Sequence, residues 1–124
     1  MARKPLHIPG RYITVLNNPV FSLVESYKSL RTNILFSMPY KEGACRKLLI
    51  TGANPGDGKT TTCVNVAITL AQANNRVLLI DGDMRKPTIH KYFDIESRVG
   101  LSNALSGMNQ ISECIKKSDT VQNL

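Results

Sequence analysis

The sequence has no tryptophan, and its aromatic residues are limited to four tyrosines and three phenylalanines in 124 residues. A surface that stacks nucleic-acid bases combines aromatic side chains with a basic groove. Here the basic residues are spread along the whole chain and no aromatic residues are interleaved with them. Nucleic acid is therefore not the expected partner, although the formal net charge of +7 is compatible with another anionic partner, such as nucleotide phosphates or membrane headgroups.

Long apolar runs are also missing, and cysteine is scarce. No run approaches the roughly 20 residues that a membrane-spanning helix needs, and the basic start MARKPLHIPG lacks the apolar stretch of a secretory signal. Cys45, Cys63 and Cys114 are odd in number, far apart and without metal-ligand spacing. They are expected to be reduced thiols of a cytosolic protein.

Local signals divide the chain into an N-terminal arm, residues 1–20, and a domain, residues 21–124. Prolines and a glycine interrupt the arm. Ser22 and Glu25 have the spacing of a capping box at the start of a helix, which ends near Met38 because a proline follows. The length of the chain allows one domain at most.

Two continuous apolar runs, KLLITG (47–52) and VLLID (77–81), predict strands that are buried on both faces. Between them, an almost wholly apolar helix is expected from Lys59 to about Asn74. Short helices are expected from about Pro87, over 101–105, and around Ile111 and Ile115. The order strand, helix, strand is a βαβ unit and predicts an α/β fold with a doubly wound parallel sheet. Open sheets usually have about four to six strands, so we expect the sequence to be the N-terminal part of a longer domain.

The segment TGANPGDGKTTT (51–62) lies between the first predicted strand and the buried helix. Gly56 and Gly58 let backbone N–H groups approach a phosphate, and the helix N-terminus attracts its charge. Lys59 can reach the outer phosphates, and the hydroxyl of Thr60 suits Mg²⁺. The loop, between a strand and a helix, therefore predicts a fold of the P-loop NTPase type that binds nucleotide phosphates with Mg²⁺. Its expected nucleotide-binding residues are Ala53, Pro55, Gly56, Asp57, Gly58, Lys59, Thr60 and Thr61.

A second polar cluster, DGDMRKP, follows the second predicted strand. Ligands of open α/β sheets bind beyond the carboxyl ends of the strands, so Asp81 and Asp83 are expected close to the phosphates. One carboxylate can hold Mg²⁺ and the other can accept a proton from an attacking hydroxyl. Arg85 adds positive charge that could stabilise the transferred phosphoryl group. The alternative is a simple turn and helix-capping role for the two aspartates.

With these motifs in order, the sequence resembles the bacterial tyrosine kinases, the P-loop autokinases of capsule and exopolysaccharide synthesis. ANPGDGKTTT looks like their Walker A loop and LLIDGDMRKP like their Walker A′ motif. ESYKSLRTNI (25–34) is similar to their oligomerisation helix, with departures at Ser26 and Lys28, and VGLSNALSG is similar to the segment that follows the Walker A′ motif in the family. The resemblance covers about residues 12 to 107.

The resemblance implies a cytosolic MgATP-dependent autokinase that a membrane-anchored activator recruits to the inner face of the membrane. It implies a ring of subunits in which each phosphorylates tyrosines of its neighbour. The catalytic residues would be Lys59, Asp81, Asp83 and Arg85, with Asp81 as the base; Thr60 and Asp83 would hold the metal; Glu25, Lys28, Arg31 and Asn33 would form the interface. The sequence lacks a third, Walker B strand and a tyrosine cluster, so the chain alone is expected to be inactive.

Two other functions remain open at the level of sequence. The first is a switch ATPase of the partition or division-site type, in which a lysine stands at the position of Asn54 and reaches the facing subunit. The absence of that lysine argues against this class. The second is a nucleotide-binding regulatory subunit without catalysis. The products formed from ATP would separate the three classes.

Overall fold

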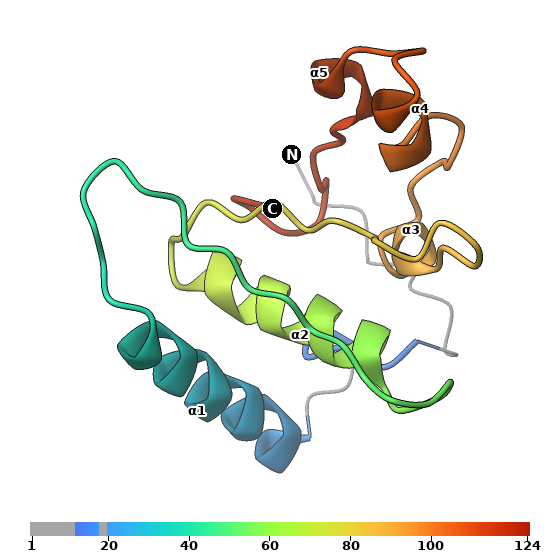
Figure 1. The fold of residues 1–124 in the computed structure, drawn as a ribbon. Helices are drawn as coiled ribbons and strands as arrows, with labels where there is room; N and C mark the ends of the chain where they lie inside the picture. The colour runs from blue at the N-terminus through green and yellow to red at the C-terminus, as the bar shows by residue number, and fades with distance from the viewer. Residues whose placement is uncertain (1–11, 18–19) are drawn as a thin grey trace, which may run out of the picture.

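The computed structural model describes residues 12–17 and 20–124 of the chain (Figure 1). The rest of the predicted arm, residues 1–11 and 18–19, lies outside the described residues. None of the helices in the described ranges is long and apolar enough to cross a membrane. These helices are α1 (Phe21–Ser37), α2 (Lys59–Gln72), α3 (Ile89–Tyr92), α4 (Leu101–Leu105) and α5 (Ile111–Cys114).

Helix α2 is the centre of the core, as its apolar sequence predicts. Val64 and Ile68 have no exposed surface, and Ala71 is 1% exposed. Tyr92 of α3 and Val121 near the C-terminus complete the buried cluster. Because these residues come from distant parts of the sequence, α2 is the element to which the other segments are attached.

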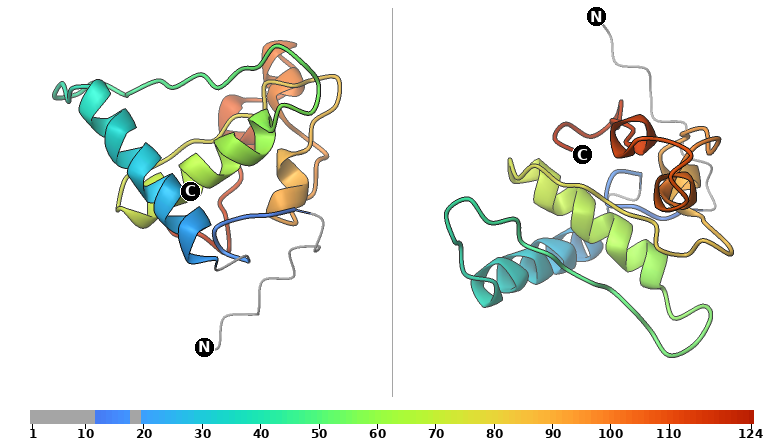
Figure 2. Two further views of the ribbon diagram at one scale, coloured as in Figure 1. Left: turned by 90° about the horizontal axis from the view of Figure 1, so that it is seen from below. Right: turned by 45° about the horizontal axis from the view of Figure 1, so that its top comes forward.

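Helix α1 packs beside α2 but buries none of its residues (Figures 1 and 2). It ends before Met38, as predicted, but the predicted capping box is wrong. The helix begins at Phe21 after Val20, which has no side-chain cap. Ser22 is therefore already inside the first turn, and Glu25 pairs with Lys28 at 2.8 Å instead of closing a box.

The two predicted strands are extended segments without a β-ladder. Residues 47–52 and 77–81 both run alongside α2 (Figures 1 and 2), but no strand is formed and no backbone hydrogen bond joins them within the described ranges. A strand needs a neighbour about 4.7–4.9 Å away. The N–H of Val77 donates to the carbonyl of Asn123 at 2.9 Å, but this contact does not extend into a ladder. The predicted doubly wound sheet is therefore not present in the described chain.

The second of these segments is nevertheless amphipathic in the way a strand is. Val77 and Leu79 pack against the core cluster, whereas Leu78 and Ile80 point away and are 60% and 56% exposed. This alternation matches the two-residue period of extended backbone. The prediction of extended backbone was thus right, while burial on both faces was wrong.

The C-terminal third contains three short helices, of which α4 has the predicted bounds. Gly107, in the left-handed region at φ 75°, follows its end, and α4 packs against α5. Helix α3 begins at Ile89, two residues later than the proline signal indicated. The reason for this later start is a carboxylate contact from the preceding turn, described below.

Candidate nucleotide-binding site

The loop before α2 has the backbone geometry of a phosphate-binding turn. Gly56 and Gly58 have φ values of 84° and 81°, in the left-handed region that a side chain disfavours. Gly58 is also the N-cap of α2. A Cβ on Gly52 would lie 3.0 Å from the carboxylate of Asp57 and from the Lys59 stem. Three glycines therefore let the loop fold closely on itself and expose its backbone.

Side chains of the loop hold it in this shape. The N–H of Asn54 donates to Oδ2 of Asp57 at 2.8 Å, and Nζ of Lys59 donates to the carbonyl of Asn54 at 3.0 Å. The lysine ammonium is therefore folded over the loop rather than extended into solvent. Asn54, which replaces the lysine typical of the switch ATPases, contributes backbone groups to this arrangement.

The first turn of α2 presents donors at the same place. The first N–H groups of a helix have no carbonyl partner within it, and here they belong to Lys59, Thr60 and Thr61; the first intrahelical bond runs from Thr62 to Gly58 at 2.8 Å. The partial positive charge of the helix N-terminus adds to them. The predicted nucleotide-binding residues thus form one continuous turn and helix start that can bind a phosphate group.

Asp81 and Asp83 both shape the turn that follows the second extended segment. Oδ2 of Asp81 accepts the N–H groups of Thr88 and Ile89, at 2.9 and 3.0 Å, and its Oδ1 accepts the N–H of Asp83 at 3.1 Å. Oδ1 of Asp83 accepts from Arg85 and Lys86. The turn and capping role that the sequence left open is therefore present, and it explains why α3 begins at Ile89.

This turn and the phosphate loop interact electrostatically. Backbone bonds from Lys86 and Arg85 lower the pKa of Asp83, and the positive charges of Lys59 and Arg85 lower it further. Burial raises the pKa of the Cys63 thiol on α2, and the negative charge of Asp81 raises it as well. The structure therefore brings the two predicted motifs close enough for their charges to interact.

A contact that the sequence did not predict links α3 to the phosphate-loop helix. The hydroxyls of Thr61 and Tyr92 lie 2.8 Å apart, and Tyr92 is 5% exposed. The ring of Tyr12 packs against that of Tyr92 in a tilted arrangement, with centroids 4.6 Å apart and planes inclined by 47°. The side-chain hydroxyl of Thr61, a residue predicted to bind nucleotide, is thus directed at Tyr92.

Asn65 is a second residue whose role the sequence did not reveal. Its side chain is fully buried, accepts the N–H of Val15 at 2.7 Å, and donates to the carbonyls of Ile13 and Thr61 at 3.3 and 2.9 Å. The amide pairs with the backbone of the arm much as a neighbouring strand would. One side chain therefore attaches residues 13–15 to the first turns of α2.

The predicted interface residues lie on α1, away from the phosphate loop. Glu25 pairs with Lys28 of the same helix, and Nη1 of Arg31 donates to the carbonyl of Thr69 on α2 at 3.2 Å. Asn33 is exposed, and its carbonyl accepts the hydroxyl of Ser37 at 2.8 Å. Within this chain Arg31 therefore ties α1 to α2, and a pairing of Glu25 or Arg31 across a subunit interface stays a prediction.

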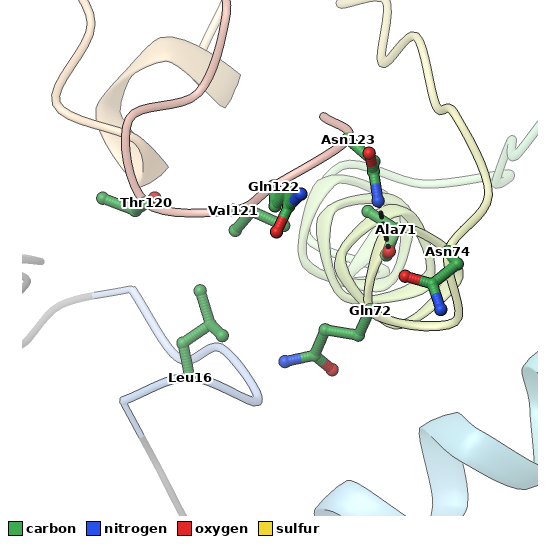
Figure 3. Close-up of a pocket in the computed structure, with 8 residues that line it drawn as sticks. All are labelled: Leu16, Ala71, Gln72, Asn74, Thr120, Val121, Gln122 and Asn123. Carbon is green, nitrogen blue, oxygen red and sulfur yellow. Dashed lines mark hydrogen bonds between the residues drawn. The ribbon is translucent and has the colours of Figure 1, made fainter.

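A hollow of about 330 Å³ lies at the opposite end of α2 (Figure 3). Ala71, Gln72 and Asn74 line one side of it, with Leu16 of the arm and residues 120–123 on the others. Nδ2 of Asn123 reaches the carbonyl of Ala71 at 3.5 Å. Because α2 has 14 residues, this hollow lies on the order of 20 Å from the phosphate loop and is not part of the candidate site.

These features, a glycine turn at the start of a buried helix with a lysine and two aspartates nearby, are those of a P-loop domain. The profile of the AAA domain family (AAA_31) matches residues 46–124. The chain belongs to this family of AAA domains.

Comparison with individual proteins narrows the similarity to bacterial tyrosine kinases, as the motifs predicted. The chain is 37% identical over 109 residues to tyrosine-protein kinase YwqD of Bacillus subtilis, covering 88% of this chain and 45% of that protein. It is 39% identical over 124 residues to the putative tyrosine-protein kinase CapB of Staphylococcus aureus, covering 100% and 52%. Tyrosine-protein kinase wzc of Salmonella typhimurium is 38% identical over 104 residues, which are 84% of this chain and 14% of that protein.

A solved structure agrees with these sequence matches. The crystal structure of the chimerical protein CapA2B2 superposes with a TM-score of 0.76 at 34% identity, over 89% of this chain and 47% of that one. The chain thus spans about half the length of the first two relatives and of this structure.

Proposed function

We propose that the protein represented by this chain is an ATP-dependent tyrosine kinase of capsule or exopolysaccharide synthesis. The observation that carries the proposal is the left-handed glycine turn at Gly56 and Gly58, which leads directly into a helix anchored in the core. Such a turn fixes backbone donors around a phosphate before it binds. The similarity to proteins named as tyrosine kinases supplies the expected acceptor.

In this proposal the phosphate chain of ATP lies over the loop 53–58 and the first turn of α2. Lys59 exchanges its contact with the Asn54 carbonyl for the outer phosphates, so its ammonium group has a hydrogen-bond acceptor before and after binding. The N–H groups of residues 59–61 bind the inner phosphates.

Magnesium fits the donor set, although the described residues contain no group of three or more metal-ligating side chains. Mg²⁺ usually takes one or two protein oxygens and completes its shell with phosphate oxygens and water. Thr60 and Asp83 can supply those protein oxygens, and the lowered pKa of Asp83 keeps its carboxylate ionised. The metal would neutralise phosphate charge during transfer.

The transfer step needs a base and a cation besides the phosphate loop. The oxygen of the acceptor tyrosine attacks the γ-phosphorus, the bond to the β–γ bridging oxygen breaks, and ADP leaves. Asp81 accepts the tyrosine proton, while Arg85 and Lys59 stabilise the charge of the transferred group. The three backbone N–H groups bound to Asp81 would orient its carboxylate during this step.

We further propose that the protein acts in the cytoplasm as a ring-forming oligomer, recruited to the membrane by a membrane-anchored activator. Glu25, Lys28, Arg31 and Asn33 would contribute to the contact between subunits. Their position on α1, whose residues are all at least partly exposed, supports this assignment. Arg31 would then have to exchange its bond to Thr69 or share it.

The experiment combines ATP binding with analysis of the products. The chain is incubated with γ-labelled MgATP, and bound nucleotide, free phosphate and phosphotyrosine are measured for the natural sequence, Lys59→Met and Lys47→Met. Lys47→Met is the matched control, because it removes a lysine outside the loop. The proposal expects binding that Lys59→Met weakens at least tenfold, a loss of about 1.4 kcal/mol.

The products separate the proposal from its alternatives. Phosphotyrosine, formed by the chain or by a longer protein that contains it, supports the kinase. Free phosphate without phosphotyrosine in the longer protein would indicate a switch ATPase, and binding without either product would indicate a regulatory subunit. Nucleotide binding that Lys59→Met and Lys47→Met change equally would contradict the phosphate-loop assignment itself.

A further inference from the structure

Helix α3 connects the two halves of the candidate site, although neither motif contains it. Its N-terminal N–H groups, of Thr88 and Ile89, are bound by the carboxylate of Asp81. Its last residue, Tyr92, meets the hydroxyl of Thr61 in the first turn of α2 at 2.8 Å. A continuous series of contacts therefore runs from Asp81 through α3 to the phosphate-loop helix.

The Tyr92 end of this connection is held firmly. The Tyr92 ring is 5% exposed and belongs to the core cluster with Val64 and Ile68. The ring of Tyr12 lies against it at a centroid distance of 4.6 Å. Because Tyr12 covers the ring, the hydrogen bond between Tyr92 and Thr61 lies in a partly buried place, where it competes less with water.

The Thr61 end is held from a second direction. The carbonyl of Thr61 accepts Nδ2 of the buried Asn65 at 2.9 Å, while its hydroxyl is directed at Tyr92. The remaining polar group, the backbone N–H, lies in the first turn of α2 and has no partner within the helix. Because the N–H groups of a helix point toward its N-terminus, this N–H faces the phosphate loop, and the two contacts hold the residue that carries it.

We propose that Tyr92 is a positioning residue of the phosphate and metal site, acting through its hydrogen bond to Thr61. The bond sets the distance between the first turn of α2, which holds phosphate, and the turn at Asp81 and Asp83, which holds the metal. The proposal rests on the nucleotide-binding function proposed above. It adds that the hydroxyl of Thr61 supports Tyr92 instead of contacting a phosphate.

The consequence is a specific loss when the hydroxyl of Tyr92 is removed. Tyr92→Phe keeps the ring and its contact with Tyr12 but releases Thr61. The phosphate loop keeps its glycines and Lys59, so nucleotide binding without metal changes little. Binding that depends on metal weakens, because the two turns are no longer fixed relative to each other. A net hydrogen bond corresponds to roughly a two- to tenfold change in affinity.

The test measures the dissociation constant for ATP by calorimetric titration, once with Mg²⁺ and once with EDTA. The variants are Tyr92→Phe, Thr61→Val and the double variant, with Tyr40→Phe as the matched control, since Tyr40 is 72% exposed in the loop after α1. Thermal unfolding of each variant is recorded alongside. We expect Tyr92→Phe to lower affinity roughly two- to tenfold with Mg²⁺ and less than twofold with EDTA.

The double variant should be no weaker than either single variant, since both remove the same bond. Equal weakening with Mg²⁺ and EDTA, or additive effects in the double variant, would overturn the proposal. If Tyr92→Phe fails to fold, Thr61→Val tests the proposal by itself, because it breaks the same bond. It should weaken ATP binding with Mg²⁺ and change binding with EDTA less than twofold. If the natural chain binds no ATP, the proposed function falls first and this inference falls with it.

Discussion

Helices α1 and α2 have similar lengths and lie side by side, but they relate to the core in opposite ways. α1 has 17 residues and buries none, whereas α2 has 14 and buries seven. Phe21 and Phe36, near the two ends of α1, are 79% and 85% exposed. The comparison shows that the residues proposed to bind nucleotide are built on the most firmly held element, and the residues proposed to bind other subunits on a superficial one.

The largest difference between the helices should appear on truncation of an apolar side chain in each. Ile68→Ala leaves a cavity at a site with no exposed surface, and should lower the free energy of unfolding by about 2–5 kcal/mol. Leu30→Ala on α1, where the side chain is 38% exposed, should cost less than about 1 kcal/mol. Urea denaturation followed by circular dichroism measures both. Equal losses would mean that α1 contributes to the core as much as α2.

The next largest difference in stability is expected between two asparagines, one on each helix. Asn65→Ala removes three hydrogen bonds to backbone groups and leaves some of those groups unpaired, so the free energy of unfolding should fall by about 1–3 kcal/mol. Asn33→Ala, on the exposed surface of α1, should change it by about 0.5 kcal/mol or less. The same denaturation experiment measures them. A loss for Asn65→Ala as small as that for Asn33→Ala would show that the arm contributes little stability.

Cysteine reactivity compares α2 with the loop that follows α1. Cys63 is half-buried, and both burial and the charge of Asp81 raise its pKa, so less of it is thiolate at a given pH. Cys45 is exposed in the loop. Iodoacetamide at pH 8 should therefore modify Cys45 several times faster than Cys63, as followed by mass spectrometry of peptides. Asp81→Asn should speed modification of Cys63 and leave Cys45 unchanged; faster labelling of Cys63 in the natural chain would refute this.

The smallest effect is expected for the ion pair on α1. Lys28 and Glu25 are 2.8 Å apart, but their side chains are 47% and 44% exposed. Lys28→Ala should therefore change the free energy of unfolding by only about 0.3–0.5 kcal/mol, and less at high salt. Thermal unfolding at low and high salt measures it, with Lys41→Ala as an exposed control. A loss well above 1 kcal/mol would show that the pair is more than a surface contact.

The local features of the site could be predicted from the sequence. Gly56 and Gly58 occur where the backbone must be left-handed, and Gly107 ends α4 for the same reason. Such signals depend on neighbouring residues only. The breadth of apolar residues in α2 likewise predicted a buried helix, since nothing but burial accommodates that pattern.

Contacts between distant residues could not be predicted in this way. The bond between Thr61 and Tyr92 spans 31 residues and that between Asn65 and Val15 spans 50. No period or motif specifies such pairs. Residues 77–81 show the limit for strands: an apolar run predicts extended backbone, but a strand also needs a neighbouring segment, and here only the N–H of Val77 finds a backbone partner within the described residues. The capping box failed because Ser22 lies one residue inside the helix that it was expected to begin.

The long-range bonds of α2 also influence how the chain reaches its folded state. Its contact with the arm closes a loop of 50 residues, and its contact with Asn123 closes one of 52 on the other side. Closing loops of this length costs entropy before the contacts compensate for it. The helix can form its own backbone bonds early but becomes secured only when both flanking segments dock. Folding should therefore be slower than its helical content suggests.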